Sequence, residues 1–176
     1  MKDSDHATWL LVDLIFDLVM PSKVFRDYAA QPDFDPRTPG FRGVLRMCRN
    51  STIIALCKLD DVLKDYGILF RDVPDDLAEQ KKMYRKYILD KKVFTYRSKF
   101  VAHNFDAFDT HSYAIGNEIA NGIFGETFGT NEAFFEWVSP QDPDPSFKGY
   151  HPAFIATRLR DHLLAKSRPA PRIGDN

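Results

Sequence analysis

The sequence lacks a segment that could anchor it in a membrane. Its longest apolar stretch near the start, residues 9–20, is interrupted by Asp13 and Asp17 and ends at Pro21. It is therefore too short and too charged to span a bilayer, and it lacks the basic leader of a signal peptide. We expect a cytoplasmic protein with no membrane partner.

Cysteine is also scarce, which limits both disulfide and metal chemistry. Cys48 and Cys57 are the two cysteines of the chain, and their spacing in a helical pattern puts them on opposite faces, where they cannot pair. We expect reduced packing thiols in a reducing compartment. Because no Cys-x-x-Cys or Cys-His cluster with ligand spacing occurs, we expect no bound metal and no cofactor.

Net charge is nearly absent as well: 24 Lys and Arg stand against 25 Asp and Glu. The chain as a whole is therefore not drawn to nucleic acid or acidic lipid, so any anion-binding surface must be local. With 176 residues, 44% of them hydrophobic and 28% charged, the composition is that of one globular domain. We expect a single domain over residues 1–166 and a frayed C-terminal tail over residues 167–176.

Apolar side chains recur with the helical period, and no alternating pattern predicts paired strands. A first helix is expected to end near Val19 because Pro21 follows, and three prolines and a glycine make residues 31–40 a loop. Further helices are expected over residues 44–66, 75–103, 112–124, 132–138 and 152–166. The sequence therefore predicts an all-α bundle of about five to six helices.

The expected helix over residues 75–103 concentrates positive charge. Between residues 81 and 99 lie eight basic residues and a single acid, Asp90. If this helix is continuous, one stripe on it is cationic and holds Lys81, Arg85, Lys92, Lys99 and His103. A separate apolar stripe, expected to be buried, holds Met83, Tyr87, Phe94 and Val101. The cationic stripe is either a solvated helix face or a binding surface for phosphate groups.

One short motif in this helix is more specific. Residues 96–104 read Tyr-Arg-Ser-Lys-Phe-Val-Ala-His-Asn, with Arg97 and His103 separated by five residues. This resembles the Arg-x(4–6)-His signature of the HEPN superfamily. The fuller pattern, in which Lys99 and an Ala-His pair follow the arginine, is similar to HEPN proteins of the abortive-infection U type. Active members commonly carry Asn, Asp or His after the arginine, where this chain has Ser98.

The resemblance implies a HEPN-like helical fold and a metal-independent endoribonuclease of a toxin or phage-defence system. His103 would assist proton transfer, and Arg97 would stabilise charge on the phosphoryl oxygens. The products would be a 2′,3′-cyclic phosphate and a 5′-hydroxyl. The expected partners are RNA and an antitoxin protein. The side chains expected to contact the RNA are those of Lys99, Ser98, Asn104, Lys92 and Arg85.

The spacing of the motif adds a geometric constraint. Six residues on a straight helix place Arg97 and His103 about 120° apart, so they do not share a face. Either the helix is distorted here, or a second subunit completes the site, as in HEPN dimers. We expect a two-fold homodimer with Phe100 or Phe105 in the contact. The structural alternatives are an ion pair of Arg97 with an acidic helix end such as Asp60 or Asp61, and a buried capping contact of His103.

Three rival interpretations remain open at this point. The first is a non-catalytic helical module that binds RNA or a protein. The second is a metal hydrolase built on His103, Asp106, Asp109 and His111, a span that also fits an ordinary polar turn. The third is a protein-interaction role for the aromatic segment over residues 134–137, for which closing the core is the plainer use.

Overall fold

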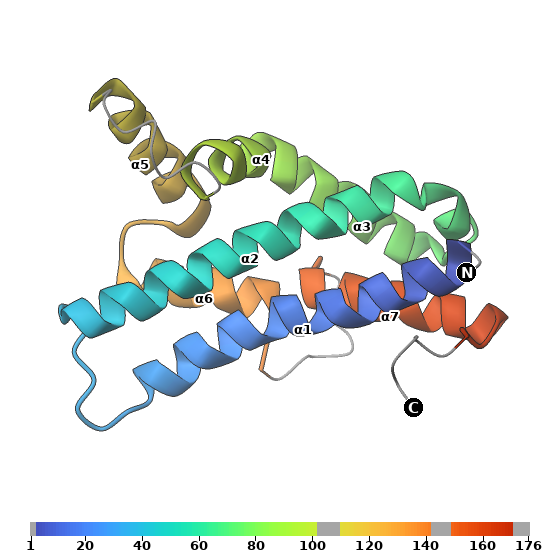
Figure 1. The fold of residues 1–176 in the computed structure, drawn as a ribbon, viewed down its shortest axis with the longest axis horizontal. Helices are drawn as coiled ribbons and strands as arrows, with labels where there is room; N and C mark the ends of the chain where they lie inside the picture. Colours follow the sequence, from blue (N-terminus) through green and yellow to red (C-terminus); the bar gives the residue numbers. More distant parts are fainter. Residues whose placement is uncertain (1–2, 102–109, 142–148, 171–176) are drawn as a thin grey trace.

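The computed structural model describes residues 3–101, 110–141 and 149–170, and these residues form helices without any strand (Figure 1). The all-α prediction is confirmed, with seven α-helices in the described part rather than five to six. The helices are α1 (Asp3–Ala29), α2 (Pro39–Asp65), α3 (Asp75–Asp90), α4 (Val93–Tyr96), α5 (Thr110–Phe124), α6 (Phe128–Val138) and α7 (Pro152–Lys166). A 3-10 turn, η1 (Gly67–Phe70), follows α2, and a π-helical turn, η2 (Arg97–Val101), follows α4.

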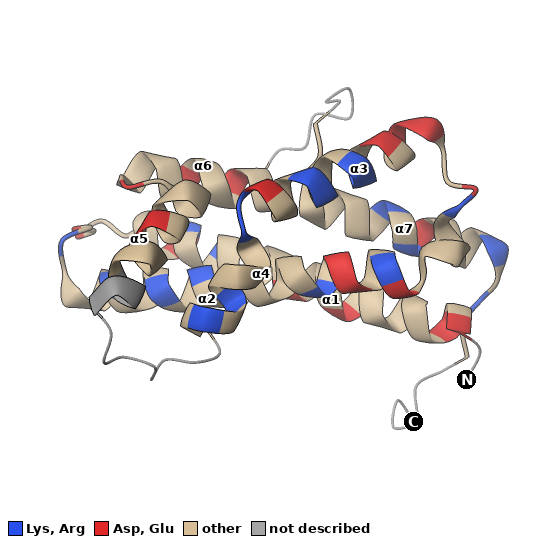
Figure 2. Cartoon of the chain, turned by 90° about the horizontal axis from the view of Figure 1, so that it is seen from above, with Lys and Arg blue, Asp and Glu red and all other residues tan. Residues whose placement is uncertain are grey.

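The two longest described helices, α1 and α2, lie side by side and form one layer of the molecule (Figures 1 and 2). Helices α6 and α7 lie behind α1, and α3 crosses behind the second half of α2. Helix α4 and the turn η2 lie against the upper side of α2 in Figure 1, and α5 extends away from it. The hydrophobic core lies between these layers. None of the described helices is both long and apolar enough to cross a membrane.

Helix α1 does not end at Pro21, so that prediction is wrong. The helix continues to Ala29 although proline has no amide hydrogen to donate to the preceding turn. Tertiary packing accounts for the difference. Phe25, one turn later, is fully buried and stacks on Phe135 with ring centroids 4.5 Å apart and on Phe128 at 5.6 Å. The burial of these rings offsets the cost of the lost backbone bond.

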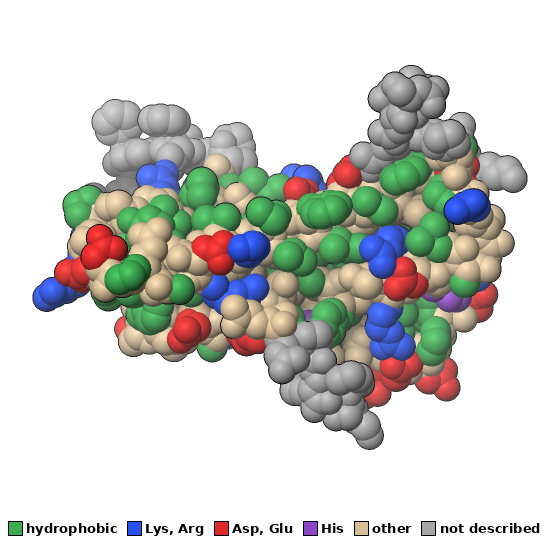
Figure 3. Space-filling model, turned by 90° about the horizontal axis from the view of Figure 1, so that it is seen from below, with side chains coloured by type: hydrophobic (Ala, Val, Ile, Leu, Met, Phe, Trp, Pro, Cys, Tyr) green, Lys and Arg blue, Asp and Glu red, His purple; other side chains and the backbone are tan. Residues whose placement is uncertain are grey.

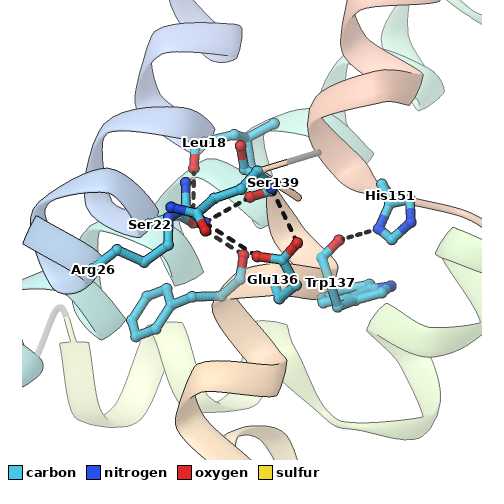
Figure 4. A network of polar contacts seen from close by, with 9 residues as sticks. Leu18, Ser22, Arg26, Glu136, Trp137, Ser139 and His151 are labelled. Carbon is cyan, nitrogen blue, oxygen red and sulfur yellow. Dashed lines mark hydrogen bonds and ion pairs between the residues drawn. The ribbon is translucent and has the colours of Figure 1, made fainter. Parts of the chain in front are cut away.

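Side chains from α1 and α7 cap the C-terminal end of α6 (Figure 4). The hydroxyl of Ser22 donates to the carbonyl of Phe135 at 3.3 Å, and Nη1 of Arg26 donates to the carbonyl of Ser139 at 2.9 Å. Nδ1 of His151 lies 2.7 Å from a further carbonyl of the same helix. The carbonyl of Phe135 also accepts the amide of Ser139, while the other two lie in or just beyond the last turn of α6, where helix carbonyls lack the next turn's amides. The contacts thus connect α1 and the residue before α7 to the end of α6.

The helix expected over residues 75–103 is broken in the middle. Helix α3 ends at Asp90, and Lys92 adopts the left-handed conformation, with φ 53° and ψ 38°. Helix α4 starts at Val93 in a new direction and passes into the π-helical turn η2. The prediction of one long continuous helix reaching His103 is therefore wrong.

The break also changes which side chains are buried. Met83 of the expected apolar stripe is exposed, and Tyr87, Phe94 and Val101 are half-buried. The positions that are buried instead are Leu77, Tyr84, Ile88 and Val93. The first three share one face of α3, and Tyr84 donates its hydroxyl proton to the carbonyl of Leu56. The left-handed conformation of Lys92 then interrupts the helical repeat, so Val93 does not continue the buried row of α3.

The expected helix over residues 152–166 is confirmed, and its row Ile155, Leu159 and Leu163 is buried. Beyond it, residues 167–170 are described without regular structure. The indole of Trp9 donates to the carbonyl of Ala170 at 2.9 Å, so this part of the expected tail contacts the first helix.

The break at Lys92 can be tested by glycine substitution. Lys92→Gly is expected to stabilise the protein by about 0.5–1 kcal/mol, because glycine adopts the left-handed conformation without steric cost. The adjacent Lys91→Gly has no such benefit and is expected to be neutral or destabilising. Urea unfolding of both variants measures the difference. A continuous helix would give the opposite result at position 92, a loss of about 1 kcal/mol.

Candidate functional site

The described part of the Arg-x5-His motif lies in the π-helical turn η2. This turn, Arg97–Val101, directly follows α4 and packs against α2. The helix is thus distorted at the motif, which was one of the two solutions expected from its spacing. Single π-helical turns occur frequently at functional sites. His103 and Asn104 lie outside the described residues, so their position relative to Arg97 stays a prediction.

Arg97 lies against the acidic end of α2. Its Nη1 is 4.0 Å from Oδ2 of Asp61, and its positive charge opposes the rise in the pKa of the buried thiol of Cys57. The expected ion-pair alternative is therefore present, at the outer limit of ion-pair distance. The Arg97 side chain stays 39% exposed, so solvent screens the pair and a ligand could still reach the guanidinium.

The basic residues of α3 do not form one cationic stripe with those of η2, so that expectation is wrong. Arg85 donates from Nε to Asp60 at 3.0 Å, and its charge is therefore paired. Lys81 lies in the same row as the buried face of α3 and donates to the carbonyl of Phe70 at 2.8 Å. Burial lowers the pKa of Lys81. Lys81 thus contributes to the packing of α3, and the RNA contact expected of Arg85 would compete with its ion pair to Asp60.

The remaining predicted RNA contacts differ in their availability. Ser98 is exposed, and its hydroxyl donates to the carbonyl of Phe94, one turn earlier, at 2.9 Å. Lys92 is exposed at the break between α3 and α4, and Lys99 is exposed on η2. Of the five residues expected to bind RNA, Lys92 and Lys99 are thus exposed cations that pair with no carboxylate within the described part of the chain.

A second set of basic residues, on α2, was not predicted. Arg42, Arg46 and Arg49 follow one another at helical spacing, and no acid occurs in the sequence between Asp35 and Asp60. Figure 2 shows Lys and Arg positions of the first half of α2 close to those of the segment that follows α4. We call these arginines, together with Arg97 and Lys99, the basic surface. The absence of acids over this stretch was the sequence signal that could have revealed it.

Arg49 is the most constrained member of the basic surface. Its Nε donates to Oδ1 of Asn131 at 2.7 Å, and its guanidinium carbon lies 4.7 Å from the centre of the Phe124 ring. Asn131 is itself buried and donates to the carbonyl of Thr127. Burial lowers the pKa of the half-buried Arg49, although an arginine remains charged at neutral pH. Among the described residues, no carboxylate pairs with this cation.

An aromatic cluster connects Arg49 to the motif. Tyr96, the residue before Arg97, lies 5.7 Å from the Phe124 ring and 5.6 Å from the Phe100 ring, between centroids. Burial raises the pKa of Tyr96, and the positive charges of Arg49 and Arg46 oppose that rise. Both arginines are thus close to the hydroxyl that precedes the motif.

Phe100 packs within the chain rather than at a free surface. It is half-buried, and its ring lies so close to the backbone of Gly116 that a Cβ there would be 2.3 Å from a ring carbon. Its availability for the expected dimer contact is therefore reduced. Phe105, the other residue named for that contact, lies outside the described residues.

A hollow of about 460 Å³ shares Phe124 with this cluster. Its wall includes Tyr87, Trp137 and Tyr150, and Lys91 lies at it as well. The indole Nε1 of Trp137 is buried and has no hydrogen-bond partner among the described residues. Aromatic walls are features on which unstacked nucleobases stack.

Metal ligands do not gather in the described part of the chain: no group of three or more His, Cys, Asp or Glu side chains there could hold an ion. The metal-hydrolase alternative at His103, Asp106, Asp109 and His111 involves residues whose side chains lie outside the description. It is therefore left untested.

Comparison with protein-family models, curated proteins and solved structures finds no match to this chain. The interpretation of the site therefore depends on its own residues.

The contact between Phe100 and Gly116 predicts opposite effects for two glycines of α5. Gly116→Ala is expected to displace Phe100 and destabilise the protein, because the added methyl overlaps the ring. In Gly122→Ala the methyl enters open space, and the better helix propensity is expected to stabilise by up to about 1 kcal/mol. Thermal unfolding of both variants tests this. Equal effects at the two positions would contradict the placement of η2 against α5.

The two cysteines are expected to react slowly in the folded protein. Burial raises the pKa of Cys48 to about 11 and that of Cys57 to about 12, from 9.0. The thiolate is the reactive form, and it accumulates only as pH rises through these values. Alkylation by iodoacetamide at pH 8 should therefore be at least about 100-fold slower than in urea. Similar rates in both conditions would show that the thiols are accessible.

Proposed function

We propose that this protein binds RNA through the basic surface and cleaves it without a metal, using Arg97 and His103 in the manner of HEPN nucleases. The observation that carries the proposal is the guanidinium of Arg49. It is half-buried and held by Asn131 and Phe124, and no carboxylate among the described residues neutralises it. A buried cation is costly unless an anion compensates it, and a phosphate group can serve as that anion.

The arrangement of neighbouring charges supports a polyanion rather than a single small anion. Arg42 and Arg46 are exposed on the same helix, two turns and one turn before Arg49 respectively. Lys99 and Arg97 extend the positive charge onto η2. A row of cations over several turns fits the repeated phosphates of a nucleic acid backbone. The aromatic hollow beside Phe124 would give unstacked bases of a single strand a surface for stacking.

The position of the motif beside these cations supports cleavage as well as binding. Tyr96, which lies close to Arg46 and Arg49, directly precedes Arg97 in the chain. A phosphate held at the basic surface would thus lie near the guanidinium proposed to stabilise the transition state. The reaction would use the ribose 2′-hydroxyl as nucleophile, with His103 assisting proton transfer, and leave a 2′,3′-cyclic phosphate.

RNA binding is tested by fluorescence anisotropy with a labelled single-stranded RNA over a range of salt concentrations. Arg46→Ala is expected to weaken binding severalfold and to reduce the slope of log K against log salt by about 0.7, because one phosphate contact is lost. Arg71→Ala is the matched control, since Arg71 is exposed outside the basic surface. If the two substitutions changed the RNA affinity and its salt dependence equally, the basic surface would not be the RNA-binding site.

Cleavage is tested with the same RNA in excess EDTA, with the product ends analysed chemically. The protein is expected to form cyclic phosphate ends, and His103→Ala and Arg97→Ala are each expected to abolish them. Binding without cleavage would favour the alternative function, a non-catalytic helical module. A strict requirement for a divalent ion would favour the metal hydrolase.

A homodimer and an antitoxin partner are further parts of this proposal that the single chain does not test. The motif spacing admits either a distorted helix or a second subunit; because η2 is distorted, the spacing no longer requires the dimer, which stays a separate part of the proposal.

A further inference from the structure

An apolar groove runs between α1 and α2, away from the aromatic cluster described above. It has a volume of about 390 Å³ and is lined mostly by apolar side chains of both helices, with Cys48 at its base. Three large residues on its walls are strongly exposed: Phe16 at 62%, Met47 at 54% and Met20 at 47%. Adjacent exposed side chains of this size mark interaction surfaces, and methionine adapts well to a partner. Figure 3, which shows the molecule from below the view of Figure 1, has hydrophobic side chains recurring along this face.

The groove continues into an acidic half. A second hollow of about 390 Å³ lies further along the same pair of helices and shares Asp17 and Lys58 with the first. The carboxylates along it are Asp13, Asp17, Asp61 and Asp65. Lys58 is the sole Lys or Arg among the lining residues, and Asp17 already binds it at 2.8 Å. One half of the groove is thus apolar and the other half is negatively charged.

The shape and length of the groove fit an α-helix. Along α1 the lining residues run from His6 to Val24, about 27 Å at about 1.5 Å per residue. A helix of about 18 residues has this length. Binding of an amphipathic helix between two surface helices is a common mode of recognition.

The charges decide what kind of helix fits. A second copy of this chain docking by the same groove would place the acidic half against another acidic half or against the apolar half. Neither offers basic side chains, because the lining residues include no further Lys or Arg than the paired Lys58. An anionic lipid surface would be repelled by the same carboxylates. The complementary occupant is a helix that is apolar at one end and basic at the other.

We propose that the α1/α2 groove binds an amphipathic helix of a partner protein. Its apolar residues would cover Phe16, Met20 and Met47, and its basic residues would face Asp13 and Asp65. This surface does not depend on the proposed function, since it would exist whether or not the chain cleaves RNA. One of its carboxylates, Asp61, also lies 4.0 Å from Arg97, so an occupant of the acidic half would compete for the counter-ion of that arginine.

The test uses synthetic helical peptides of about 18 residues. The first peptide has leucines along one face of its first half. Along the same face of its second half it has lysines. In the matched peptide, glutamates replace the lysines. Both are made in both sequence orders, because the direction of the bound helix is not fixed. Isothermal titration with the full chain is expected to give at least tenfold tighter binding of a lysine peptide. Equal affinities of the lysine and glutamate peptides would overturn the proposal.

Three variants locate the binding site. Phe16→Ala is expected to weaken the lysine peptide at least tenfold, and Asp65→Asn is expected to narrow the difference between the lysine and glutamate peptides. Leu89→Ala is the control, since Leu89 is 77% exposed outside the groove and should leave both affinities unchanged. Unchanged binding in Phe16→Ala would overturn the proposal. So would light scattering that shows a dimer which Phe16→Ala converts to a monomer, because the occupant would then be a second copy.

Discussion

Helix α2 must bury most of its circumference, because six described segments pack on it: α1, α3, α4, α7 and the turns η1 and η2. Its sequence meets this demand in its central turns, where Thr52, Ile53, Ala55, Leu56 and Cys57 are all buried. Such a helix cannot be amphipathic there, and its neighbours must cover it from several sides. The layers of the molecule follow from this requirement, since each later segment covers a part of α2 that is still open.

The same helix separates three kinds of chemistry along its length. Its first half carries arginines without acids, its middle is apolar, and its end carries Asp60, Asp61 and Asp65. The segments that pack on it therefore meet different partners. The turn η2 brings Arg97 to the acidic end, and Tyr96 just before it lies near the arginines. The proposed RNA site and the proposed helix-binding groove thus use different stretches of one helix.

Local signals predicted those parts of the fold that local interactions determine. The body of α2 was predicted from its helical period, but its start was not: the helix was expected from residue 44 and begins at Pro39, where Thr38 caps it by accepting from the amide of Phe41. The final helix was predicted with its bounds because a proline opens it and its apolar row is regular. The course of the chain at Pro21 and Lys92 could not be predicted in this way. At Pro21, burial of distant rings overrides a local helix breaker, and at Lys92 a residue without strong turn preference adopts the left-handed conformation.

The candidate site shows a similar division. The motif at Arg97 is visible in the sequence because its residues are neighbours in the chain. The role suggested for Arg49 is not visible in the sequence. Asn131 and Phe124, which contact its guanidinium, lie far from it along the chain. The row of arginines and the absence of acids around it were visible, but local charge alone does not show which cation is half-buried. Only the contacts of Arg49 with Phe124 on α5 and Asn131 on α6 distinguish it from its exposed neighbours.

The two exposed thioethers of the apolar groove have a chemical consequence. Met20 and Met47 lie on opposite walls, one on each helix, and both are accessible to solvent. Peroxide converts such a side chain into a sulfoxide, which is strongly polar and adds an oxygen that must be hydrated. Oxidation of either residue would turn that wall of the groove hydrophilic without disturbing the buried core. The surface would therefore lose its affinity for apolar side chains under oxidative stress, and sulfoxide reduction would restore it.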